Sequence, residues 1–118
     1  MKDPKRKPRK SVDTAKETPS QPAPTNNSAH RRLHVFYSGT VQGVGFRYSV
    51  LTLAQRFKLN GWVRNCPDER VEVMVEGDVQ ELERYLQSIG DEMCRYIKKV
   101  ERSWENATHE WNSFKILP

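Results

Sequence analysis

The sequence contains few cysteines and no long apolar run. Its two cysteines among 118 residues, Cys66 and Cys94, do not have the spacing of a metal site. We expect both to be reduced thiols. No apolar stretch follows the basic N-terminal residues, so no secretory signal is expected. No apolar run is long enough to cross a membrane either. The length of 118 residues leaves room for one domain, and we expect its core to need neither a metal nor a disulfide.

The positive charge is unevenly distributed along the chain. The formal net charge is +5, which invites the interpretation of a nucleic-acid-binding protein. Residues 1–32 hold nine Lys or Arg and three acidic residues, whereas residues 33–118 hold eleven basic and twelve acidic ones. The basic character therefore belongs to the N-terminal segment, and we expect the remaining domain to need no nucleic acid.

The N-terminal segment, residues 1–30, is rich in Pro, Ser, Thr, Asn and Lys. It has too few apolar residues to offset the entropy lost on ordering, so we predict a disordered tail. Its basic cluster is compatible with a nucleic-acid contact, a membrane-surface contact or a localisation signal. The favoured interpretation is a solubilising extension.

Residues 31–118 alternate between strand-like and helix-like patterns. Apolar spacing of 3–4 residues predicts a helix over residues 47–58, ended by Asn60-Gly61, and a second helix that Asp78 caps and Gly90 ends. Period-two or apolar runs predict strands over residues 33–38, 61–65, 70–76, 96–105 and 114–117. The order is β-α-β-β-α-β with a short extra C-terminal strand. We therefore predict the α+β fold class, as a ferredoxin-like two-layer sandwich with an antiparallel sheet and two helices on one face.

A glycine-rich run joins the first predicted strand to the first helix: Gly39-Thr40-Val41-Gln42-Gly43-Val44-Gly45-Phe46-Arg47. Glycine lets several backbone N–H groups converge on one point, and the start of a helix adds unpaired amides and a partial positive charge. Arginine offers two parallel donors to phosphate oxygens. The run lacks the Gly-Lys-Ser/Thr ending of a Walker A loop and the spacing of a dinucleotide fingerprint. It predicts a cradle for a single phosphoryl group.

The second predicted strand ends in Trp62-Val63-Arg64-Asn65, close to this cradle if the sandwich forms. A carboxamide such as Asn65 can accept from a water molecule and donate to an oxyanion, but it is not a strong base. A hydrolytic site built this way depends on positioning and charge stabilisation.

These two segments resemble the acylphosphatases. The similarity covers about residues 31–118 and includes both motifs at the family's spacing, together with Val71-Glu72, Glu76-Gly77 and the closing Phe114–Leu117. The resemblance implies a small cytoplasmic hydrolase that cleaves the carboxyl-phosphate bond of acyl phosphates, with no metal or other cofactor. It also implies that Arg47 and Asn65 are the catalytic residues. The phosphate-binding backbone amides would be those of Gln42, Gly43, Val44, Gly45, Phe46 and Arg47.

By the family pattern Arg47 holds the phosphate, Asn65 positions the attacking water, and the substrate phosphate supplies the basicity. We expect a monomer that acts on a small-molecule acyl phosphate and needs no membrane. One departure is Asp68-Glu69, where the family usually has Asp-Gly. Glycine accepts a positive φ at little cost, so Glu69 should be strained or should force another turn type.

Three alternatives keep the fold but change the function. The first is a non-catalytic nucleic-acid-binding ferredoxin-like module, although Glu72 and Glu76 on the third strand would repel a phosphate backbone. The second is a domain of the much longer carbamoyltransferases that mature hydrogenases. The third is a catalytically silent phosphate sensor. His30, His34 and His109 fit no ligand or catalytic spacing, and Trp62, Trp104 and Trp111 are expected in core or rim packing.

Overall fold

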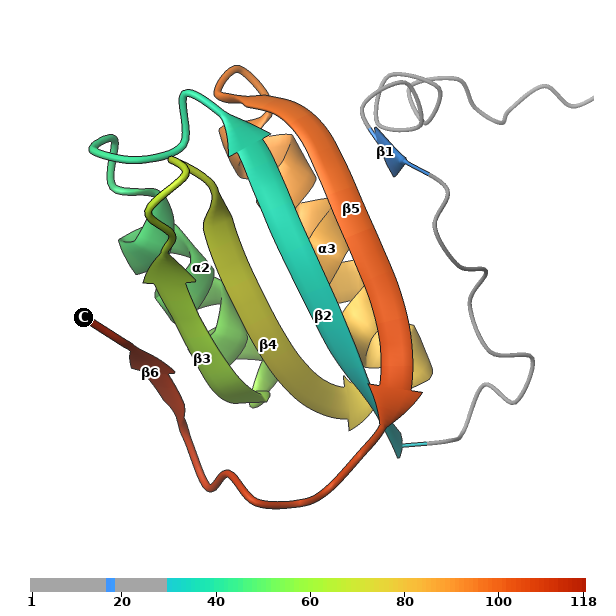
Figure 1. Cartoon of the computed structure of the whole chain (residues 1–118). Coiled ribbons are helices and arrows are strands. Elements are labelled where there is room, and N and C mark those ends of the chain that lie inside the picture. Colours follow the sequence, from blue (N-terminus) through green and yellow to red (C-terminus); the bar gives the residue numbers. More distant parts are fainter. Residues whose placement is uncertain (1–16, 19–29) are drawn as a thin grey trace, which may run out of the picture.

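The computed structural model describes residues 17–18 and 30–118, and two helices pack against one face of its sheet (Figure 1). The chain order confirms the predicted β-α-β-β-α-β pattern and its closing strand. The elements are β1 (Glu17–Thr18), β2 (His30–Gly39), α2 (Phe46–Phe57), β3 (Asn60–Asn65), β4 (Val71–Asp78), α3 (Val79–Met93), β5 (Ile97–Asn106) and β6 (Phe114–Ile116). The disorder predicted for the basic tail concerns residues that lie almost entirely outside the described ranges, and it stays a prediction.

The strand order in the sheet is β1-β5-β2-β4-β3-β6. The central pairs β5–β2, β2–β4 and β4–β3 are antiparallel, as expected. The two outermost strands join in parallel, β1 beside β5 and β6 beside β3, so the sheet as a whole is mixed. The reason for the direction of β6 is visible in Figure 1, where residues 107–113 cross from the end of β5 to the start of β3 before β6 begins.

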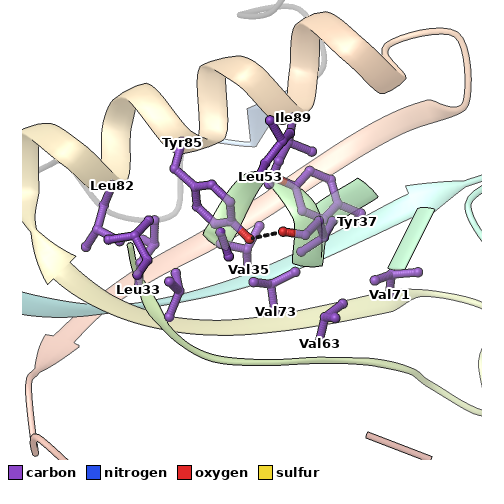
Figure 2. Close-up of a cluster of buried hydrophobic side chains, with 14 of the residues drawn as sticks. Leu33, Val35, Tyr37, Leu53, Val63, Val71, Val73, Leu82, Tyr85 and Ile89 are labelled. Atoms are coloured by element: carbon purple, nitrogen blue, oxygen red, sulfur yellow. Dashed lines mark hydrogen bonds between the residues drawn. The ribbon is translucent and has the colours of Figure 1, made fainter. Parts of the chain in front are cut away.

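The core lies between the sheet and the helices (Figure 2). Alternate residues of β2 and β4 are fully or almost fully buried, because period-two side chains share one face of a strand. They meet the buried stripes of α2 and α3. The sheet contributes Leu33, Val35, Tyr37, Val63, Val71, Val73 and Val75, and the helices contribute Val50, Leu53, Ala54, Val79, Leu82, Tyr85 and Ile89.

Tyr85 is a core residue of α3 although its ring carries a polar hydroxyl group. Its side chain is fully buried, whereas Leu86 is partly buried. The hydroxyl of Tyr85 donates to the carbonyl oxygen of Val50 at 3.0 Å, which satisfies the polar end of the ring and ties α3 to α2. Burial also raises the pKa of this hydroxyl well above its ordinary value.

Both helix ends differ from the prediction. α2 ends at Phe57 because Lys58 adopts the left-handed conformation with φ 59°, which turns Leu59 into the core, so Asn60-Gly61 is not the stop. α3 continues through Gly90 to Met93. A glycine inside a helix costs about 1 kcal/mol, and burying a methionine side chain stabilises by about 1.5–3 kcal/mol. The buried Met93 therefore offsets the glycine.

The start of α3 agrees with the prediction. The carboxylate of Asp78 accepts from the backbone N–H of Gln80 at 3.2 Å and caps the helix. Glu81 pairs with Arg84 on the surface. In the part of the chain that the structure describes, neither helix has the length and hydropathy needed to cross a membrane.

Candidate functional site

The loop between β2 and α2 has the backbone that the glycine pattern predicted. Gly43 and Gly45 have φ angles of 81° and 78°, in the left-handed region that other residues rarely adopt. Gly45 is the N-cap of α2 and no side chain caps this helix by a hydrogen bond. The first intrahelical bond that closes here runs from the N–H of Ser49 to the carbonyl of Gly45. The preceding amides of the first turn thus remain available to an anion.

A pocket of about 170 Å³ opens at this helix start. Its lining combines the glycine loop with the first turn of α2 and the last residue of β6: Val41, Gly43, Gly45, Phe46, Arg47, Tyr48 and Ile116. Val41 and Phe46 are buried beneath the loop and anchor it to the core, whereas Gly43 and Gly45 are exposed. The loop is therefore held from below and presents its backbone outward.

Arg47 is the basic group of this pocket. Its side chain forms no ion pair or hydrogen bond with any other described residue, in contrast to Arg32, Arg64 and Arg70, which are all paired with carboxylates. α2 also has no acidic residue in its first turn, so nothing there offsets the partial positive charge of the helix start. Arg47 and the helix end together make this pocket favourable for a phosphoryl group.

Asn65 is the last residue of β3, opposite Val71 of β4. Its Oδ1 atom is buried and has no hydrogen-bond partner among the described residues. A buried polar oxygen without a partner is costly, so its presence needs a functional or structural reason. Asn65 does not itself line the pocket around Arg47.

The side chain of Gln42 connects the cradle to the segment that follows Asn65. Its Nε2 donates to the carbonyl oxygens of Cys66 and Arg70, both at 2.9 Å. Each carbonyl also accepts from a turn amide, since the N–H of Cys66 bonds to Arg70 and that of Glu69 bonds to Cys66. The loop of Gln42 and the end of β3 are thus fixed relative to each other. Figure 1 shows both segments at the same end of the sheet.

The turn after Asn65 retains the conformation of the glycine that it lacks. Glu69 has a φ of 73°, so the chain keeps the left-handed turn and strains the glutamate, which is the first of the two outcomes expected from the sequence. Asp68 supports the turn, because its carboxylate accepts from the backbone N–H and the Nε of Arg70.

Replacing Glu69 with glycine is expected to raise the free energy of unfolding by about 1 kcal/mol, because glycine adopts this φ without a Cβ clash. Urea denaturation of both proteins measures the change. Glu69→Ala is the matched control: alanine removes the same carboxylate but keeps the Cβ, so it should give no such gain. An equal gain in both variants would attribute the effect to charge instead of backbone strain.

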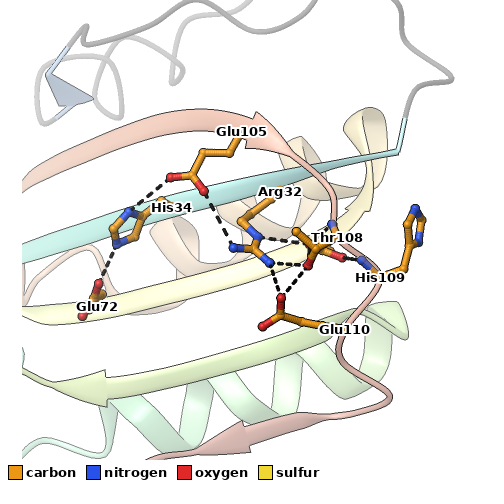
Figure 3. Close-up of polar contacts among 8 residues, drawn as sticks. Arg32, His34, Glu72, Glu105, Thr108, His109 and Glu110 are labelled. Carbon is orange, nitrogen blue, oxygen red and sulfur yellow. Dashed lines mark hydrogen bonds and ion pairs between the residues drawn. The ribbon is translucent and has the colours of Figure 1, made fainter.

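The face of the sheet opposite the helices is occupied by paired charges (Figure 3). Glu72 is buried and binds His34 Nε2 at 2.6 Å and Arg64 Nε at 2.8 Å. Burial raises the pKa of the Glu72 carboxylate, but the hydrogen bonds from His34 and Arg64 lower it more, so the net pKa lies below the ordinary value. Two buried carboxylates in this face, Glu72 and Glu76, do not favour contact with a nucleic-acid backbone.

One group of potential metal ligands occurs among the described residues. Atoms of His30, Glu76 and His109 lie within 4.8 Å of one another, and the two rings stack at 4.7 Å. His30 is the first residue of β2, whereas the glycine loop follows its last residue. The group therefore lies at the opposite end of the sheet from the pocket of Arg47. The carboxylate of Glu76 already accepts from two backbone amides and Arg32.

Sequence reasoning missed three features of this site. Gln42 was expected to contribute its backbone amide, and the bridging role of its side chain depends on a turn 24 residues away. Tyr48 and Ile116 were assigned no role, although both line the pocket. No local signal marks them, because an exposed aromatic residue on a helix and an exposed isoleucine on an edge strand are ordinary surface features.

Comparison with known proteins concerns the family and the fold of the chain. Residues 33–116 match the family model described as Acylphosphatase. An acylphosphatase of Trichormus variabilis is 55% identical over 56 residues, which are 48% of this chain and 55% of that protein. The matched stretch thus spans about half the length of that relative. An acylphosphatase of Roseiflexus sp. is 42% identical over 89 residues, covering 73% of this chain and 94% of that protein.

A solved structure shows the same fold. The crystal structure of acylphosphatase from Bacillus subtilis superimposes with a TM-score of 0.69 and 28% sequence identity. The superposition covers 75% of this chain and 99% of that protein. The predicted ferredoxin-like arrangement and the resemblance noted from the two motifs are both confirmed.

Proposed function

This chain belongs to the acylphosphatase family, and on that premise we propose that it hydrolyses acyl phosphates to a carboxylate and inorganic phosphate. The phosphoryl group binds to the amides of residues 42–47 and to the guanidinium of Arg47. A water molecule held by Asn65 attacks phosphorus while the bond to the acyl oxygen breaks. The carboxylate leaves with that electron pair, and the water proton passes to a phosphate oxygen of the substrate.

The chemistry needs little base strength because a loose phosphoryl transition state develops charge on the leaving group and the equatorial oxygens. Arg47 and the amide cradle stabilise that charge at fixed positions. Asn65 orients the water through its carboxamide oxygen. Following the family pattern, the proposal includes no metal and no other cofactor.

The observation that carries the proposal is the uncapped start of α2 opening into the same pocket as the unpaired Arg47. The buried and partnerless Oδ1 of Asn65 supports the role of water positioning. The family pattern also suggests a monomeric enzyme of the cytoplasm. Cys66 and Cys94 are not joined in a disulfide, which is compatible with a reducing compartment.

Phosphate release from acetyl phosphate and benzoyl phosphate, measured with a chelator present, tests the proposal. Turnover under these conditions is expected. Absence of turnover with both substrates would contradict it. Inorganic phosphate binding measured by calorimetry on such an inactive protein would then indicate a phosphate sensor.

Replacing Gln42 with alanine is expected to lower kcat by about tenfold to a hundredfold, because the cradle and the end of β3 lose their connection and small misplacements of reacting groups are costly. Steady-state kinetics measures kcat and KM. The backbone amide of residue 42 and the remaining hydrogen bonds of both carbonyls persist, so the free energy of unfolding should fall by about 1 kcal/mol or less.

Gln55→Ala is the matched control for this variant, since Gln55 is an exposed glutamine on α2. It should leave kcat unchanged. Gln42→Glu should lose more activity than Gln42→Ala, because a carboxylate would face two carbonyl oxygens. An unchanged kcat in both Gln42 variants would contradict the proposed positioning role of the Gln42 side chain.

A further inference from the structure

The pocket around Arg47 has an apolar side next to its cationic end. Among the described residues, two large apolar or aromatic residues are exposed, Tyr48 at 67% and Ile116 at 37%. Both line the pocket that contains Gly43, Gly45 and Arg47. Single exposed apolar residues are common, but here both border one small pocket. We refer to Tyr48 and Ile116 as the apolar rim.

Two unrelated parts of the chain build the apolar rim. Tyr48 directly follows Arg47 in the first turn of α2, so the two side chains leave the helix about 100° apart. Ile116 is the last residue of β6 and is in register with Val63 of β3. The parallel β3–β6 pairing thus sets where Ile116 lies relative to the helix start.

We propose that the apolar rim binds the acyl group of the substrate and gives this enzyme a preference for acyl phosphates with an aromatic or bulky apolar acyl group. The inference rests on the proposed function and extends it to substrate class. In an acyl phosphate the carbonyl carbon is two bonds from phosphorus. With the phosphoryl group on Arg47 and the loop amides, the rest of the acyl group must lie beside the next wall of the pocket.

The chemistry of the rim matches such a group. Tyr48 offers an aromatic face for stacking or edge contact, and Ile116 offers an aliphatic surface. An acyl group that covers these side chains removes apolar surface from water on both partners. Removing roughly 50 Å² of such surface from water changes affinity by about tenfold. A methyl group, as in acetyl phosphate, covers much less of the rim.

The test compares kcat/KM for benzoyl phosphate and acetyl phosphate, expressed as a ratio so that the intrinsic reactivity of each substrate cancels between variants. Tyr48→Ser is expected to lower the ratio about tenfold, and Ile116→Ser to lower it severalfold. Tyr48→Phe keeps the ring and should keep the wild-type ratio. Lys115→Ser is the control on β6, because Lys115 does not line the pocket of Arg47 and the ratio should not change.

A binding measurement separates this inference from the proposed function. Benzylphosphonate and methylphosphonate cannot be hydrolysed. Calorimetric titration therefore measures the affinity for each of them, and hence the preference for an apolar group, whether or not the protein turns over substrate. Tighter binding of benzylphosphonate, with the preference largely lost in Tyr48→Ser, supports the acyl site. An equal preference in the wild type, Tyr48→Ser and Ile116→Ser overturns it. Failure of the wild type to hydrolyse either acyl phosphate contradicts the proposed function, and the titration still decides the role of the rim.

Discussion

Replacing Arg47 with alanine is expected to reduce kcat/KM for acyl phosphates by at least about a thousandfold. The guanidinium would carry the largest share of charge stabilisation on the phosphoryl group, and removal of one arginine from a phosphoryl-transfer site typically costs a factor of 10³–10⁵. Inorganic phosphate should also bind more weakly. Arg47→Lys restores the charge but not the paired donors, so it should recover a minor part of the activity.

Asn65→Ala should reproduce the loss of turnover by a different route. Its effect should fall mainly on kcat, because Asn65 orients the water and Arg47 holds the phosphate. The matched control for Arg47→Ala is Arg56→Ala. Arg56 is an exposed arginine in the last turn of α2, the helix that also carries Arg47, and it does not line the pocket. Circular dichroism and urea unfolding check that each variant folds. More than a tenth of the wild-type activity in Arg47→Ala would refute the assignment of the site.

Replacing Glu76 with alanine is expected to lower the free energy of unfolding by about 3 kcal/mol, which is the scale for removing one member of a buried ion pair. The side chain is 3% exposed and its carboxylate accepts from Arg32 and from the backbone N–H groups of Thr108 and His109. The bonds to Thr108 and His109 fix the segment that leads from β5 to β6. Denaturation by urea measures the loss.

The stabilisation by Glu76 should also depend on pH. Burial raises the pKa of this carboxylate, but the hydrogen bonds from Thr108, His109 and Arg32 lower it more, so its net pKa in the folded protein is below the ordinary value of 4.5. The unfolded chain therefore takes up the proton first as the pH falls. The contribution is complete above about pH 4.5 and is lost as the pH falls through the folded pKa. The difference in free energy of unfolding between the wild type and Glu76→Gln should therefore become smaller as the pH is lowered below about 4.5.

Glu110→Ala is the control for this network. Glu110 binds the same Arg32 at 3.2 Å, but its side chain is 55% exposed, so solvent screens the pair. A loss of about 0.5 kcal/mol or less is expected. An equal loss of unfolding free energy in Glu76→Ala and Glu110→Ala would contradict the view that burial of the carboxylate determines its contribution to stability.

The predicted elements and the observed ones agree where local patterns are strong. The alternating valines of β4 and the 3–4 spacing on α2 each determine which face is buried, so their types and order could be read directly. The residues at which the helices end could not be predicted in this way. Lys58 takes the left-handed position and Met93 prolongs α3 because Leu59 and Met93 find space in the core, and that space depends on the whole sandwich.

The sequence by itself determined the glycine loop and the adjacent Arg47, because these features depend only on neighbouring residues. At Glu69 the sequence left two outcomes open, and the structure decided for the strained left-handed turn. Only the tertiary structure decided the contacts that link distant segments. Gln42 reaches the turn after Asn65, and Ile116 borders the pocket beside Tyr48, 68 residues away in the chain. Such contacts arise from strand pairing and helix packing across the sandwich, and no local pattern of residues encodes them.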